Sequence, residues 1–178
     1  MKTIIAILLL TICSSAQDYT KSEIEEIAKT ASLKGKVIDE LKMYSRTGSY
    51  DVYFEFDYFK EKPHKVGPIP AVTKIAAENI IIMTSPLPDG QSLYMLITYD
   101  KKTKVYKKYS CIPKAPLTKL IGVGTKNSNS IAWTAATPAK QVILSQEYND
   151  SKGSNWYTVI YENGKAVRAE TGSAIYKE

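Results

Sequence analysis

The chain contains few of the residues that build metal sites, disulfides and nucleic-acid contacts. It has two cysteines (Cys13 and Cys111), one histidine (His64) and two arginines (Arg46 and Arg168). Zinc sites need several His, Cys or carboxylate ligands in register, so we predict no metal site and no cofactor. Cys13 lies in the N-terminal apolar run, which leaves Cys111 alone and excludes an intramolecular disulfide in the mature domain.

Motifs for catalysis are also missing. No G-x-S-x-G elbow occurs, and His64 is the one candidate base for a serine hydrolase. Cys111 has no identifiable base, which favours a small buried hydrophobic role over a nucleophilic one. Carboxylates such as Glu147 and Glu170 have no spacing that the sequence defines. The sequence therefore predicts a protein that is not an enzyme.

The positive charge is mild and dispersed. The net charge is +6, carried mostly by lysine. Base readout and phosphate recognition depend on arginine, so nucleic-acid binding is not expected. Five lysines fall in Tyr99–Cys111, YDKKTKVYKKYSC. We interpret this stretch as a hairpin whose Lys102, Lys104 and Lys108 face water, and weak, salt-sensitive contact with an anionic surface is the alternative.

The first 16 residues, MKTIIAILLLTICSSA, have the features of a secretory signal peptide. Lys2 gives a positive start, a short apolar run follows, and Ser14 and Ala16 are small residues at the positions that a signal peptidase reads. The run is about half the length of a membrane-spanning helix, and no later segment is more apolar. We therefore predict cleavage after residue 16, a secreted or periplasmic protein, and no transmembrane segment. Lipidation of Cys13 is the alternative.

Residues 17–47 predict a short helical segment. Ser22 and Glu25 fit a capping box, and apolar residues follow at helical spacing. Gly35 separates this stretch from a second short apolar face that includes Leu41. Because an apolar helix face seeks a core, we expect both helices to pack on the main domain; binding of a partner protein is the alternative.

From residue 48 onward the hydrophobic period changes to that of strands. In SYDVYFEFDYF, apolar and polar side chains alternate, so that Phe54 and Phe56 share one face. Residues 60–71 contain three prolines and predict a long loop that holds His64. Short strands and polar turns then alternate to the end, about nine or ten strands in all. Short connections of this kind indicate antiparallel pairing.

Closure of these strands into a barrel would remove the two exposed edges of a single open sheet. Gly122, Gly124 and Gly172 stand where a barrel needs sharp bends. We therefore predict a mainly β fold, an antiparallel barrel of about 8–10 strands over residues 48–178 with short N-terminal helices. A two-sheet sandwich is the alternative.

The order of turn and aromatic signals over residues 79–178 resembles a family of bacterial secreted lipocalin-like (calycin-type) proteins of unknown function. The residues that carry the resemblance are Tyr99-Asp100 with Thr103 and Tyr106, Gly122 and Gly124, Trp133, Glu147-Tyr148 with Asp150 and Gly153, and Gly164-Lys165. The resemblance implies a lipocalin-like barrel. Heme-binding relatives place a histidine near the C-terminus, and none stands there in this chain, so heme is not expected.

A barrel of this size can enclose a small ligand. The side chains that we expect to face inward, as core or as pocket lining, are Phe54, Phe56, Met95, Tyr109, Trp133 and Trp156, with Glu170 to orient a ligand. The sequence thus favours a secreted protein that binds a small apolar ligand inside a β-barrel. The alternative is a structural or adhesive envelope protein with a solid barrel and a basic surface.

Overall fold

The computed structural model describes residues 18–59, 62–124, 129–136 and 140–177. The predicted signal peptide and Cys13 lie outside these residues. Among the described residues, no helix is long and apolar enough to cross a membrane.

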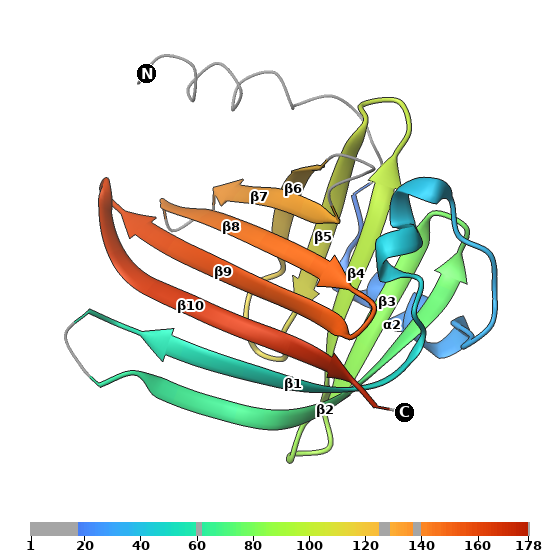
Figure 1. Cartoon of the computed structure of the whole chain (residues 1–178), viewed down its shortest axis with the longest axis horizontal. Coiled ribbons are helices and arrows are strands. Elements are labelled where there is room, and N and C mark those ends of the chain that lie inside the picture. Colours follow the sequence, from blue (N-terminus) through green and yellow to red (C-terminus); the bar gives the residue numbers. More distant parts are fainter. Residues whose placement is uncertain (1–17, 60–61, 125–128, 137–139, 178) are drawn as a thin grey trace.

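The described strands form a closed antiparallel barrel in which each strand pairs with its neighbours in sequence and the last strand pairs with the first (Figure 1). The strands are β1 (Gly48–Asp57), β2 (His64–Ala77), β3 (Ile80–Pro86), β4 (Ser92–Asp100), β5 (Val105–Cys111), β6 (Thr118–Gly124), β7 (Ser130–Ala136), β8 (Gln141–Asp150), β9 (Gly153–Glu162) and β10 (Lys165–Tyr176). The prediction of a lipocalin-like antiparallel barrel is confirmed, and the two-sheet sandwich is wrong.

Short polar turns set the hairpins. Asn163 and Gly164 join β9 to β10 with φ angles of 50° and 77°, the left-handed pair that a tight hairpin requires. Asp150 closes the β8–β9 turn, where its carboxylate accepts the backbone N–H groups of Lys152 at 2.7 Å and Gly153 at 3.1 Å. In the β4–β5 turn, the Asp100 carboxylate accepts backbone N–H groups in the same way. These aspartates explain why the turns fall where the sequence predicts them.

The loop predicted over residues 60–71 is wrong for most of its length, because β2 begins at His64 and continues through Pro68 and Pro70. The register against β1 shifts between the pairs Val52–Ile69 and Phe54–Val66. Pro68 falls inside this irregularity, where a missing N–H breaks no ladder bond. A proline-rich stretch can therefore remain a strand at such a shift.

Helix α2 (Lys21–Thr30) packs on the outer face of the barrel, over β2, β3 and β4. Its capping box is formed by Thr20 and Glu23, two residues before the predicted pair of Ser22 and Glu25. Both pairs fit the motif, but Lys21 already has helical geometry, so the first pair forms the cap. Ile24 is fully buried against Ile82 and its neighbours. The predicted packing of this helix on the barrel is confirmed.

The second predicted helix is η1 (Asp39–Tyr44), a 3₁₀ helix at one end of the barrel (Figure 1). Leu41 is completely buried and contacts Ile81, Ile97 and Trp133 from the barrel interior. The hydroxyl of Tyr106 in β5 donates to the carbonyl of Glu40 at 3.0 Å, and this hydrogen bond holds η1 against the barrel. This end of the barrel is therefore filled by the protein itself.

Candidate functional site

The barrel interior differs between its two ends. At the η1 end the inward side chains are buried in two apolar clusters. Toward the other end, at the height of the β1 residues that follow Val52, inward apolar side chains remain partly exposed. They include Phe54, Phe56, Val66, Leu93, Ile143 and Trp156, whereas Ile160 and Ala135 in the same half are buried. This half of the interior is where the structure leaves apolar surface within reach of a ligand.

Two tryptophans face the interior, and each lies over a glycine of the neighbouring strand. Trp133 is opposite Gly122, and Trp156 is opposite Gly172. A Cβ on Gly122 would lie 2.5 Å from the indole of Trp133, and one on Gly172 would lie 2.1 Å from the indole of Trp156. These glycines leave room for the indole rings, a role that the prediction of sharp bends did not include.

Each indole also donates its Nε1–H to a glutamate fourteen residues later in the sequence. Trp133 donates to Glu147 at 3.0 Å, and Trp156 donates to Glu170 at 3.3 Å. The equal spacing is a coincidence, because Glu147 stands two residues after Ser145, the cross-strand partner of Trp133, whereas Glu170 stands two residues before Gly172, the partner of Trp156. Among the described residues, the interior therefore holds two glutamates, Glu147 beneath η1 and Glu170 in the half away from η1.

The inner carboxylate, Glu147, belongs to a buried polar cluster. Lys108 from β5 forms an ion pair with it, and the side chains of Lys108 and Glu147 are only 14% and 5% exposed. The Lys108 ammonium also lies over the Trp133 ring, 4.4 Å from its centroid, and Asn149 donates to Glu147 at 3.4 Å. A buried pair of this kind contributes when its remaining donors and acceptors are satisfied, as they largely are here.

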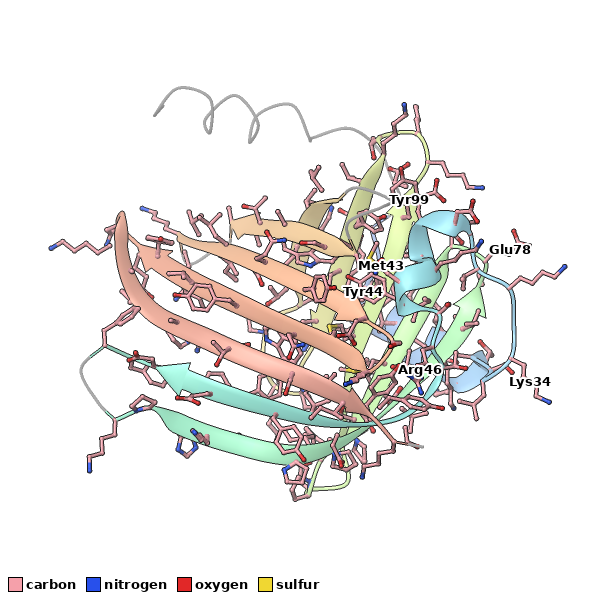
Figure 2. All side chains as sticks on the ribbon, viewed as in Figure 1. Lys34, Met43, Tyr44, Arg46, Glu78 and Tyr99 are labelled. Atoms are coloured by element: carbon pink, nitrogen blue, oxygen red, sulfur yellow. The ribbon has the colours of Figure 1, made fainter. Side chains whose placement is uncertain are left out.

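Tyr44 of η1 lies above this cluster. Its hydroxyl is buried and meets no acceptor at hydrogen-bonding geometry within the described residues. Burial, followed by the Glu147 carboxylate, raises the pKa of Tyr44 well above the ordinary value. A cavity of about 70 Å³ separates η1 from the strands, lined by Met43, Tyr44 and Glu147 among others. Figure 2 shows Met43 and Tyr44 on the side of η1 that faces the strands. The cavity is large enough for a few water molecules.

The outer carboxylate, Glu170, has an aromatic and cationic setting. Phe54 packs edge-on against Trp156, with ring centroids 5.4 Å apart, and stacks on Phe56 at 5.7 Å. Arg168 lies 3.9 Å from Glu170 and places its guanidinium 5.7 Å from the Phe56 ring. Burial raises the pKa of Glu170, and this effect outweighs the opposing contributions of Trp156, Arg168 and the more distant Lys108. Glu170 is thus an acid that holds its proton more readily than an exposed glutamate.

The raised pKa of Glu170 predicts a pH dependence of stability. Above the ordinary glutamate pKa the unfolded chain loses this proton while the folded chain keeps it, so the free energy of unfolding falls as pH rises toward the raised pKa. Glu170→Gln removes this decline. Urea unfolding at several weakly acidic pH values should show that the free energy of unfolding of the variant increases relative to that of the wild type as pH rises. Glu55→Gln, on the outer face of β1, serves as control, and a constant difference between wild type and Glu170→Gln would contradict the expectation.

Six of the seven predicted site residues face the interior: Phe54, Phe56, Met95, Trp133, Trp156 and Glu170. Trp133 lies at the η1 end of the barrel and is 2% exposed, so it belongs to the hydrophobic core. The placement of Tyr109 is wrong, because it faces outward beneath α2 and donates to Asp18 at 3.0 Å. The strand β5 has both faces covered, and its sequence does not reveal which one points inward.

The expectation that Lys108 faces water is also wrong, since it points into the barrel. Cys111, on the opposite face of β5, is 3% exposed beneath α2, and burial raises the pKa of its thiol. A buried thiol with a raised pKa suits the small hydrophobic role that the sequence predicts. Lys108 and Arg168 are interior groups that the sequence pattern did not indicate. No local signal links each tryptophan to its glutamate, because the two pairs cross their hairpins with opposite offsets.

Comparison with known proteins adds no function to this geometry. No family model matches the sequence, and no curated protein matches it. The residues of the barrel interior are therefore the basis for a proposed function.

Proposed function

We propose that the protein binds a small, mainly apolar ligand in the half of the barrel interior away from η1. One observation carries the proposal. In that half, Phe54, Phe56 and Trp156 form a contiguous aromatic wall whose side chains remain partly exposed although they face inward. Partly exposed inward aromatics of this kind are typical of a ligand site, whereas a solid barrel would bury them.

The polar groups beside the wall suggest what part of a ligand they contact. Glu170 is 18% exposed, lies next to Trp156, and in its protonated form donates a hydrogen bond. The Nε of Arg168 is buried without an acceptor among the described residues. A ligand with an apolar body and one polar acceptor, such as a carbonyl or hydroxyl oxygen, would accept a hydrogen bond from protonated Glu170 beside the Arg168 guanidinium.

Secretion or export to a periplasm is part of the same proposal. The charged start, short apolar run and small residues at positions 14 and 16 support it. The resemblance of residues 79–178 to lipocalin-like proteins, which remains a prediction, is consistent with a carrier.

The test is a titration of the full mature chain with a fluorescent fatty-acid-like probe. We expect saturable binding to the wild type and at least about a tenfold loss in Phe54→Asp, because a charge in the aromatic wall opposes an apolar ligand. Tyr157→Asp is the matched control, since Tyr157 is on the outer face of β9 and 51% exposed. Absence of saturable binding to the folded wild type, or equal binding to Phe54→Asp, would refute the proposal.

A structural or adhesive role is the second candidate, and one observation favours it. The outer face of β6–β9 carries exposed apolar side chains that neither α2 nor η1 covers, among them Val123, Leu144, Tyr148 and Tyr157. Exposed apolar patches often mark interaction sites. For this role, Tyr157→Asp should weaken self-association or surface attachment, and Phe54→Asp should not. For a carrier, by contrast, Phe54→Asp is the variant with the effect and Tyr157→Asp is the control.

A further inference from the structure

A groove of about 570 Å³ lies outside the barrel, beside the β4–β5 hairpin. Its lining comes from the N-terminal segment, the residue before η1, the β2–β3 turn and the hairpin, and it includes Tyr19, Glu78, Tyr99, Lys101, Lys102 and Lys107. Figure 2 shows Tyr99 and Glu78 on either side of η1. This groove is separate from the interior site and contains three of the five lysines of the Tyr99–Cys111 stretch.

Lys107 distinguishes the groove from an ordinary basic surface. It faces outward from β5, opposite Thr98 in the ladder, yet its side chain is only 7% exposed. Thr98 is buried as well, with 6% exposure. Lysine is almost never this buried without a partner, because its charge loses hydration. A neighbouring group must therefore compensate the charge of the Lys107 ammonium.

The described residues compensate Lys107 only weakly. Its ammonium forms no hydrogen bond among them, and its ion-pair partner, Asp18, is 3.8 Å away. The same Asp18 oxygen already accepts from Lys119 at 2.5 Å and from Tyr109 at 3.0 Å. The other nearby carboxylate, Asp100, accepts the backbone amides of its own turn with Oδ1, while its Oδ2 is buried without a hydrogen-bond partner among the described residues. Burial, together with the ammonium of Lys119, lowers the pKa of Lys107.

We propose that this groove binds a small molecule that bears a carboxylate or phosphate group, with Lys107 as the buried counter-ion. The oxyanion would supply the hydrogen bonds that the Lys107 ammonium lacks and restore its charge balance. Lys101 and Lys102 add positive charge at the exposed rim, and the rings of Tyr19 and Tyr99 offer flat walls for a compact ring-shaped body. Glu78 and Asp100 also line the groove, and their carboxylates would disfavour a second negative charge on the ligand.

The experiment compares benzoate, phenyl phosphate and inorganic phosphate as probes, titrated into the full mature chain by calorimetry or amide chemical shifts. We expect saturable binding of at least one ring-bearing anion, weakened by added salt. Lys107→Met should reduce its affinity at least about tenfold, since the charge-assisted contacts are lost. Lys104→Met is the matched control, because Lys104 is exposed on the same hairpin and does not line the groove.

Each outcome is decisive. Preference for benzoate or for phenyl phosphate identifies the oxyanion, and either preference supports the site if Lys107→Met abolishes it. Equal affinity in Lys107→Met and the wild type, or no saturable binding of any probe, overturns the proposal. Thermal denaturation of the wild type with and without the bound probe gives a second readout that needs no variant, and we expect the probe to raise the melting temperature. These results do not depend on Phe54, so they are independent of the proposed interior site.

Discussion

Replacing Trp133 with alanine is expected to lower the free energy of unfolding by about 3–5 kcal/mol. The indole is 2% exposed and fills the space above Gly122, with Tyr106 at its edge and the Lys108 ammonium over its face. Alanine would leave a cavity there and remove the hydrogen bond to Glu147. Chemical denaturation of wild type and variant measures the difference.

Trp156→Ala is the comparison for this prediction. Trp156 has the same arrangement over a glycine and beside a glutamate, but it remains partly exposed. A side chain that already contacts solvent has less burial to lose, so the loss should be clearly smaller. Equal losses for the two variants would contradict the distinction between a filled end and an accessible half of the barrel.

The second large effect is expected at the buried ion pair. Glu147→Leu removes the partner of Lys108, whose side chain is 14% exposed, and should cost about 3–5 kcal/mol because an uncompensated charge remains inside the barrel. Lys108→Met should be similarly harmful. The double variant should recover most of the loss, since replacing both charges by apolar groups of similar size is often nearly neutral. A double-mutant cycle by urea unfolding measures this coupling.

The outer pair of Lys65 and Glu55 is the control for that cycle. Their side chains are 78% and 41% exposed and their charged atoms are 3.4 Å apart. Exposed pairs contribute about 0–1 kcal/mol, so the coupling there should be small. If the Lys108–Glu147 double variant lost as much as the sum of the two single variants, the pair would not act as a coupled unit.

The alternating pattern of the strands could be predicted from the sequence, because one side of each strand meets the core. In β1 and β4, inward positions such as Phe54 and Met95 follow the two-residue period. In β5 the pattern is ambiguous, because α2, about eighty residues earlier, covers the outer face. Both Tyr106 and Tyr109 are therefore buried, on opposite faces. No local pattern carries that information.

The charged part of the site was the hardest to predict. Lysines in Tyr99–Cys111 are typical of a solvated hairpin, and Lys102 and Lys104 are indeed exposed. Lys107 and Lys108 are buried by segments that are distant in the sequence: Lys107 lies 3.8 Å from Asp18 of the N-terminal part, and Lys108 pairs with Glu147 from β8. Charge pairing across such distances depends on the barrel closure and not on neighbouring residues in the sequence.

The central claim is that the half of the barrel lined by Trp156 is open to an apolar ligand while the half around Trp133 is filled. Quenching of each tryptophan by acrylamide tests it most directly, with Trp133→Phe and Trp156→Phe each leaving one indole to observe. We expect Trp156 to be quenched and then shielded by a saturating apolar probe, and Trp133 to be poorly quenched with or without the probe. Poor quenching of both indoles, with no change at Trp156 when the probe is added, would contradict the account.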